Sequence, residues 1–256
     1  MRFESSRDRR LRAAREILSS SRRVAAFSGA GLSADSGLAT FRDPDPDALW
    51  SRFDPIELAS AEGFAANPQR VIDWYNWRRG NYASVHPNAA HRALAGQQRM
   101  IQITQNVDHL LEQAGVAPQR VYHLHGSILQ DRCHNSACVH REQVDLEKPP
   151  GLRACPRCGD RLRPAVVWFG ENLPQETWAL ARRLCTALDC LLVIGTSATV
   201  YPAAGLIALA RQHGSGVIVV DPNPGAASGA ADVHLDRSAA DILPALLDGF
   251  DLGSGP

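Results

Sequence analysis

The sequence predicts an α/β fold, a doubly wound parallel sheet interrupted by a small metal-stabilised insertion. Short apolar runs recur along the chain, and each leads into a polar or glycine-containing loop and then a helical pattern, as in sheets built from β-α-β units. Four cysteines lie between residues 133 and 158 in a segment with too few apolar residues to close a core unaided. The length of 256 residues fits one large domain with an insertion, or two unequal domains.

The composition is that of an ordinary globular protein. The chain has 27 basic and 27 acidic side chains, and 45% of its residues are hydrophobic, which disfavours a disordered chain, a collagen and a coiled coil. Because the net charge is zero, binding to nucleic acid or membranes would need a local basic patch, and none is evident. The apolar run 190–210 is interrupted by polar residues and Pro202, and the N-terminus lacks the apolar segment of a secretory signal. We expect a cytoplasmic monomer that binds neither nucleic acid nor membranes.

The N-terminal part supplies the first strand and a candidate ligand-binding loop. A one-sided apolar stripe predicts a helix over 7–19, and the apolar run 24–27 predicts a buried strand. The next residues place Gly29, Gly31 and Ala34 in the spacing of a dinucleotide-binding fingerprint. The acidic residue that a dehydrogenase carries about 20 positions later is missing, because that region is proline-rich and then helical. The loop alone fits either dinucleotide binding or simply a tight turn from strand to helix, and the missing acidic residue disfavours a conventional dehydrogenase.

A long helix follows the proline-rich region. Asn67 and Pro68 are typical of an N-cap and a first helical residue, and the pattern predicts a helix to about residue 82. Tyr75 and Arg78 fall on its apolar stripe, whereas the neighbouring Arg79 is expected to point elsewhere. An arginine on an inward face needs an anion, unless it reaches solvent by snorkelling while the tyrosine simply packs.

Polar side chains come directly after the next two predicted strands, at 100–104 and from 121. Asn106 and Asp108 follow the first, and His125 follows the second. A lone histidine is more often a structural core residue, but one that shares a sheet edge with an amide and a carboxylate is well placed for acid–base chemistry. We expect the other histidines nearby to be structural or solvated: His86, His91, His109 and His123.

Four cysteines have the spacing of a zinc ribbon, with four, sixteen and two residues between them. Two disulfides or unlinked thiols are the alternative, but nothing marks the chain as secreted. Four thiolates fill a tetrahedral shell and leave no position for water, so the metal should be structural. The predicted ligands are Cys133, Cys138, Cys155 and Cys158.

The C-terminal part returns to the parallel sheet. Strands are predicted over 190–194 and 216–220, with helices before and between them. The first of these strands leads into Gly195, Thr196 and Ser197, a second small loop rich in hydrogen-bond donors. A dinucleotide that lies across the switch point of a parallel sheet needs two loops of this kind, one at the end of each of two strands, to donate hydrogen bonds to it.

Together these segments resemble the sirtuin family, protein deacylases that consume NAD. The matching segments keep the family's order over residues 10–248: 29–37 with 40–42, 104–108, 124–126, the four cysteines, 166–171 and 195–202. The resemblance implies a Rossmann-like domain with a helical module and an inserted zinc ribbon. Its expected boundaries are 1–42, 86–128 and 163–250 for the Rossmann-like domain, 43–85 for the helical module and 129–162 for the zinc module.

The resemblance also implies roles for individual residues. His125 and Asn106 would be catalytic: nicotinamide leaves, the acyl oxygen attacks the ribose carbon, His125 takes a proton from a ribose hydroxyl, and the product is O-acyl-ADP-ribose. The substrate peptide would pair through backbone hydrogen bonds with Val167, Phe169, Gly170 and Glu171. NAD would be bound by Gly29, Ala30, Gly31, Thr40, Phe41, Arg42, Gln105, Asn106, Asp108, Gly195, Thr196, Ser197, Asp221 and Asn223. Asp221 and Asn223 differ from what many sirtuins carry, which leaves the adenosine ribose contact open, and Thr40 stands where many deacetylases have an aspartate.

Three residues indicate the class of acyl group. Tyr75 and Arg78 resemble the pair by which one sirtuin subclass recognises succinyl- and malonyl-lysine, and Ala59 falls where that subclass keeps a small residue. A guanidinium fork suits a carboxylate. We therefore expect a protein-lysine desuccinylase and demalonylase with secondary deacetylase activity. The alternatives are a plain deacetylase, a protein mono-ADP-ribosyltransferase, which needs no acyl pocket, and a non-catalytic NAD-sensing or zinc-dependent scaffold.

Overall fold

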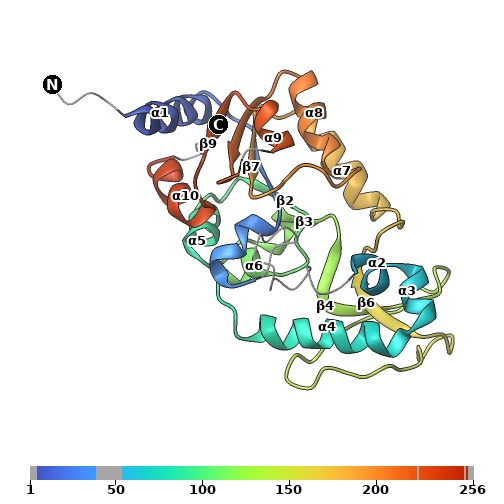
Figure 1. Cartoon of the computed structure of the whole chain (residues 1–256). Coiled ribbons are helices and arrows are strands. Elements are labelled where there is room, and N and C mark those ends of the chain that lie inside the picture. Colours follow the sequence, from blue (N-terminus) through green and yellow to red (C-terminus); the bar gives the residue numbers. More distant parts are fainter. Residues whose placement is uncertain (1–4, 39–53, 224, 251, 253–256) are drawn as a thin grey trace.

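The computed structural model describes residues 5–38, 54–223, 225–250 and 252. It contains a sheet of six parallel strands and a smaller antiparallel sheet of three. Figure 1 shows the parallel sheet with its covering helices in the upper part, and the small sheet beside a long helix, α4 (Pro68–Ala83), in the lower part. This arrangement confirms the predicted α/β fold. No helix in the described ranges is both long and apolar enough to cross a bilayer.

The parallel sheet is built from β1 (Val24–Ser28), β2 (Ile101–Thr104), β3 (Val121–His123), β7 (Cys190–Ile194), β8 (Gly216–Val220) and β9 (Val233–Leu235). The strand order is β3-β2-β1-β7-β8-β9, and every neighbouring pair is parallel. Three of the predicted apolar runs form the neighbouring strands β1, β7 and β8. These strands are buried because helices cover both faces of the sheet. The order reverses between β1 and β7, so this is the switch point at which such sheets bind ligands.

Two groups of helices cover the sheet. One face packs against α1 (Ser6–Ser19), α5 (Ala89–Ala95) and α10 (Ala239–Leu247), and the other against α7 (Gln175–Cys185) and α8 (Gly205–Gln212). Two single-turn helices lie in connections, α6 (Leu110–Gln113) and α9 (Ala226–Gly229). The sequence pattern had not predicted β9 or α10. Strand β9 is very short, and α10 carries a proline, Pro244, which usually argues against a helix interior.

The loops that follow β1 and β7 touch backbone to backbone. The Gly29 N–H donates to the Ile194 carbonyl and the Gly31 N–H to the Gly195 carbonyl, both at 2.9 Å. A Cβ on Gly31 would lie 2.6 Å from Gly195 Cα, and one on Gly195 would lie 2.5 Å from Gly31 Cα. Gly195 also has φ +56°, in the left-handed region. Neither position has room for a side chain.

A helical unit precedes the second strand of the sheet. It consists of α2 (Pro55–Leu58), α3 (Ala61–Ala66) and α4. The predicted start of α4 is confirmed, because the Asn67 side chain accepts a hydrogen bond from the Arg70 N–H at 3.0 Å and Pro68 is the first helical residue. The expectation for the two arginines of α4 needs correction. Arg79 is the fully buried one, whereas Arg78 is partly exposed.

The small sheet had not been predicted. It contains β4 (Gly126–Cys133), β5 (Arg141–Gln143) and β6 (Leu162–Val166), in the order β5-β4-β6. The sequence indicated a single strand from 121 to a His-Gly end, but the chain leaves β3 after His123 and enters β4 at Gly126. Gly126 has φ +78°, and a Cβ there would lie 2.0 Å from the Ala165 carbonyl oxygen. This close approach lets β4 and β6 pair directly beside His125.

The glycine contact at the switch point generates a stability prediction. Gly195→Ala should lower the free energy of unfolding by about 1–3 kcal/mol, because the new methyl group forces the two loops apart and strains the backbone. Gly80→Ala is the matched control: Gly80 lies inside α4, and a methyl group added there would have nothing within 4 Å. It should raise the free energy of unfolding by about 0.5–1 kcal/mol. Urea denaturation measures both, and equal stabilities of the two variants would contradict the close-contact account.

Candidate functional site

Hydrogen bonds join the carboxyl ends of three strands into one polar cluster. Ser28 at the end of β1 donates to the Thr104 hydroxyl at the end of β2 (2.9 Å), and Thr104 Oγ1 accepts from the Asn106 N–H (3.0 Å). The Gln105 side-chain amide donates to the Thr196 hydroxyl, just beyond β7, at 2.9 Å. The sheet edge therefore brings together predicted cofactor residues from segments about ninety positions apart.

The glycine loop is tied to the same edge through Ser33. The Asn106 side-chain amide donates to Ser33 Oγ at 3.2 Å, and Ser33 donates to an Asp108 carboxylate oxygen at 3.0 Å. The other Asp108 oxygen accepts from the Leu110 N–H at 3.2 Å. Burial raises the pKa of Asp108, and these two hydrogen bonds only partly oppose it. Asn106 and Asp108 thus face the loop at fixed positions, as the sequence predicted for a shared site.

His125 is held in one orientation beside this cluster. Its Nδ1 lies 2.9 Å from the Gln105 carbonyl oxygen, which can only accept a hydrogen bond. In the neutral ring Nδ1 therefore carries the proton, and Nε2 keeps its lone pair. Burial lowers the pKa of His125, partly offset by the hydrogen bond to Gln105. The side chain is a neutral base near pH 7, poised to accept a proton at Nε2.

A second histidine group lies next to Asn106, and sequence reasoning had not connected it to the site. His123 Nδ1 lies 2.9 Å from the Asn106 carbonyl oxygen, and its Nε2 lies 2.8 Å from Glu112 Oε1. The same Glu112 oxygen lies 3.2 Å from His109 Nδ1, and the two imidazole rings stack at 4.5 Å. The three side chains are close enough to share a metal ion, but both imidazole rings already contact the same Glu112 oxygen. We therefore describe them by their hydrogen bonds.

The residues predicted for the adenosine half follow β7 and β8. These strands are neighbours, with Ile194 opposite Val220, so the loops that begin at Gly195 and Asp221 leave the sheet side by side. Asp221 is half-buried, and its Oδ1 accepts from the Asn223 N–H at 2.9 Å. Three further predicted cofactor residues lie outside the described residues: Thr40, Phe41 and Arg42.

The four predicted cysteine ligands converge. Their sulfur atoms all lie within 4.8 Å of one another. Two of the distances are 3.4 Å, between Cys133 and Cys158, and 3.8 Å, between Cys138 and Cys155. Four thiolates around one zinc ion, at about 2.3 Å each, stand about 3.8 Å apart. The donor set and the spacing fit a tetrahedral structural zinc.

The residues predicted for acyl recognition share one apolar cluster, which includes Ala59, Tyr75 and Trp168. The Tyr75 hydroxyl accepts a hydrogen bond from Trp168 Nε1 at 2.9 Å and keeps its own proton to donate. The guanidinium carbon of Arg78 lies 4.9 Å from the Trp74 ring centre and 5.6 Å from that of Tyr75. Burial lowers the pKa of Arg78. A cation therefore lies at the aromatic edge of this cluster.

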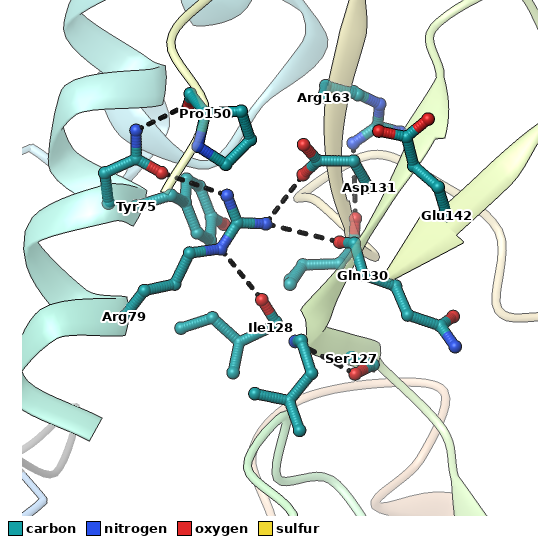
Figure 2. Close-up of polar contacts among 12 residues, drawn as sticks. Tyr75, Arg79, Ser127, Ile128, Gln130, Asp131, Glu142, Pro150 and Arg163 are labelled. Carbon is teal, nitrogen blue, oxygen red and sulfur yellow. Dashed lines mark hydrogen bonds and ion pairs between the residues drawn. The ribbon is translucent and has the colours of Figure 1, made fainter. Parts of the chain in front are cut away.

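Arg79, one position further along α4, binds to β4 inside the protein. It donates to the Ile128 carbonyl at 2.9 Å, the Gln130 carbonyl at 3.3 Å and an Asp131 carboxylate oxygen at 2.6 Å (Figure 2). Both members of the ion pair are almost completely buried. Asp131 also pairs with Arg153 of the zinc module at 2.9 Å. The network therefore fixes α4 to β4 and to the cysteine-bearing segment.

The predicted peptide-binding segment lies between His125 and Ala59. The Val167 N–H donates to the His125 carbonyl and the Phe169 N–H to the Ala59 carbonyl, at 2.9 and 2.8 Å. Phe169 and Gly170 are exposed. The Glu171 carboxylate is engaged within the protein, because it accepts from Arg132, Arg163 and the Trp168 N–H.

Comparisons with known proteins agree on one family. The Sir2 family model matches residues 29–202. The chain is 46% identical over 232 residues to an NAD-dependent protein deacylase of Mycobacterium tuberculosis (strain ATCC 25618 / H37Rv), covering 88% of this chain and 97% of that protein. It is 42% identical over 247 residues to NAD-dependent protein deacylase 1 of Pseudomonas aeruginosa (93% and 98% covered).

Solved structures give the same result. The crystal structure of a Sir2 homolog–NAD complex superposes with a TM-score of 0.85 at 38% identity, over 93% of each chain. The structure of Sir2Af2 bound to a myristoylated histone peptide superposes with a TM-score of 0.72 at 29% identity, over 94% of this chain and 96% of that one.

Proposed function

The chain belongs to the Sir2 family and is an NAD-dependent protein-lysine deacylase, and we propose that it prefers acidic acyl groups, succinyl or malonyl, over acetyl. One observation carries this preference. The Arg78 guanidinium lies against the rings of Trp74 and Tyr75, at the edge of the apolar cluster that contains Ala59. A carboxylate at the end of an acyl chain is the ligand that such a cation binds best.

The two glycine loops and the polar sheet edge are the proposed NAD site. Their backbones approach with no side chain between them at the switch point, so the pyrophosphate of NAD could come close to the main chain of both loops. When bound, NAD supplies the bond between nicotinamide and ribose whose cleavage drives acyl removal. The proposed contacts within the described ranges are Gly29, Ala30, Gly31, Gln105, Asn106, Asp108, Gly195, Thr196, Ser197, Asp221 and Asn223.

His125 is the proposed proton acceptor. Its Nδ1–H is occupied by the Gln105 carbonyl, so only Nε2 can accept a proton from a ribose hydroxyl. Its lowered pKa keeps Nε2 unprotonated at neutral pH, at the cost of some basicity. Asn106 is proposed to act beside it, with its side-chain amide directed by Ser33.

The segment 167–171 is proposed to pair with the substrate backbone. Its inner N–H groups already bond to His125 and Ala59, so a peptide here would lie between the proposed base and the apolar cluster. Recognition through backbone hydrogen bonds tolerates varied sequences. Since the Glu171 carboxylate is occupied by two arginines, this residue would contribute its backbone only.

Plain deacetylation is the alternative that stays closest to this proposal. It would require Arg78 only to pack on Trp74 and Tyr75, as a cation–π contact. The two possibilities differ in what Arg78 does for each substrate: an acidic acyl chain gains a charge-assisted partner, whereas acetyl gains none. Comparing the two substrates in one variant therefore separates them.

We predict that Arg78→Met lowers kcat/KM for succinyl-lysine peptides by about 10- to 100-fold, because charge-assisted hydrogen bonds are lost. Activity on the same peptide bearing acetyl-lysine should hold or rise. Arg70→Met on the same helix is the matched control, since its ion pair with Glu57 is exposed and contributes little. An equal loss on both substrates would show that Arg78 is structural and would favour plain deacetylation.

Tyr75→Phe is a poorer test of the same proposal. The substitution leaves the buried Trp168 indole N–H without its acceptor, which costs about 1–3 kcal/mol of stability on its own. A change in activity would therefore mix folding with recognition. The Arg78 and Arg70 pair avoids this difficulty.

A further inference from the structure

A cavity of about 300 Å³ opens beside the proposed peptide-binding segment. Its lining includes Val166, Val167 and Gly170, so a side chain of a peptide bound along this segment could reach it. The charged residues of its lining are Arg132, Arg141 and Glu171. None of them has a role in the deacylation chemistry proposed above.

The charges around this cavity are unbalanced. Arg132 on β4 and Arg141 on β5 stand directly opposite each other in the antiparallel pair, an arrangement that is unfavourable for like charges. Glu171 pairs with Arg132 at 3.2 Å but also with Arg163, which is fully buried. Two guanidinium groups therefore share one carboxylate. Arg141 is exposed and forms no ion pair with another residue that the structure describes.

We propose that this cavity is a subsite for an acidic side chain, aspartate or glutamate, of the substrate polypeptide near the acyl-lysine. The proposal rests on the proposed function, because a peptide paired with 167–171 is what would bring side chains to the cavity. A carboxylate between Arg132 and Arg141 converts their repulsion into two attractive pairs. This subsite is separate from Arg78, which lies in the helical unit and faces the acyl group.

The test uses one acyl-lysine peptide in matched pairs, with asparagine or aspartate placed in turn at each position flanking the lysine. Aspartate should raise kcat/KM by about two- to fivefold at one or two positions, mainly through KM, as expected for a partly exposed ion pair. The advantage should shrink at high salt. Arg141→Gln should abolish the aspartate-to-asparagine ratio. Since it removes a like-charge pair, the variant should melt no lower than wild type.

Arg161→Gln is the matched control, because Arg161 is an exposed arginine of the same zinc module that does not line the cavity. It should keep the wild-type ratio. A ratio of one at every position, or an unchanged ratio in Arg141→Gln, would overturn the subsite. The acyl preference is read separately, from succinyl and acetyl forms of the asparagine peptide. Either proposal can therefore fail while the other stands.

A second inference rests on the histidine group beside Asn106. The two partners of His123, a carbonyl oxygen and a carboxylate, can only accept hydrogen bonds. Both ring nitrogens must therefore carry protons, which makes His123 an imidazolium paired with Glu112. The other ionisable groups that face it are Asp108 and the stacked His109. The His109 backbone N–H donates to the Tyr82 hydroxyl, and the ring Nε2 of His109 lies 2.8 Å from Ser127 Oγ.

We infer that the His123–Glu112 ion pair is a positioning device that holds the Asn106 carbonyl, and with it the side chain that faces the glycine loop. Loss of the proton at His123 Nε2 would turn a lone pair toward the Glu112 carboxylate, and the repulsion would displace the ring whose Nδ1–H holds the Asn106 carbonyl. Burial alone would lower the pKa of His123, but the hydrogen bond and the charge of Glu112 raise it. The protonated form therefore persists to higher pH than in a free imidazole and is lost as pH rises through this raised pKa.

This account predicts a bell-shaped pH profile for kcat. The acid limb belongs to His125, whose pKa is lowered by burial, so activity should fall below pH 6.5, and the alkaline limb belongs to His123. Glu112→Gln should move the alkaline limb to lower pH by about one unit and reduce kcat more than KM, while the acid limb stays in place. Glu176→Gln, at an exposed glutamate of α7, should leave both limbs unchanged.

A measurement on the unmodified enzyme covers the case in which Glu112→Gln fails to fold. NMR titration of the ring resonances, with His123→Gln used for assignment, should give His123 a pKa that coincides with the alkaline limb. An unmoved alkaline limb in a folded Glu112→Gln variant would overturn the inference. So would a neutral His123 at pH values where the enzyme is still fully active.

Discussion

The close approach of two glycine backbones determines where the site can form. Gly29 and Gly31 after β1 bond directly to Ile194 and Gly195 at the end of β7, with no room for a side chain between them. This contact brings Thr196 to Gln105, and Ser33 to Asn106 and Asp108. Without this contact the strand ends would move apart, and the residues of the proposed NAD site would no longer lie together.

A second constraint connects this site to the smaller part of the molecule. Arg79 and Asp131 form a buried ion pair that also holds two carbonyls of β4. Burying two charges is costly, and an ion pair of this kind specifies one arrangement of its elements more than it adds stability. Because Asp131 also binds Arg153, the zinc module, β4 and α4 share one network. The start of β4, at His125 and Gly126, is positioned from both sides.

Much of this organisation could be predicted from the sequence, and the failures have physical reasons. Continuous apolar runs mark buried parallel strands, and cysteine spacing marks a zinc site, because both depend on local pattern. The small sheet escaped prediction since its strands bury charged residues, Asp131 and Arg163. The sequence pattern placed Arg78 rather than Arg79 on the buried face of α4, and a rotation of the helix by one residue separates the two possibilities. The partner that identifies Arg79 as the buried arginine, Asp131, is about fifty positions away in the sequence. The His123–Glu112 pair likewise depends on contacts between elements that no spacing reveals.

The central claim is that this Sir2-family enzyme removes acidic acyl groups in preference to acetyl. The most direct measurement incubates the wild-type enzyme with NAD and one lysine peptide bearing succinyl, malonyl or acetyl, or no acyl group, followed by mass spectrometry. The account predicts that the succinyl and malonyl peptides are deacylated with a higher kcat/KM than the acetyl peptide. Nicotinamide and O-acyl-ADP-ribose should form in amounts equal to the deacylated peptide. Faster loss of acetyl than of succinyl, or ADP-ribosylated peptide without deacylation, would contradict it.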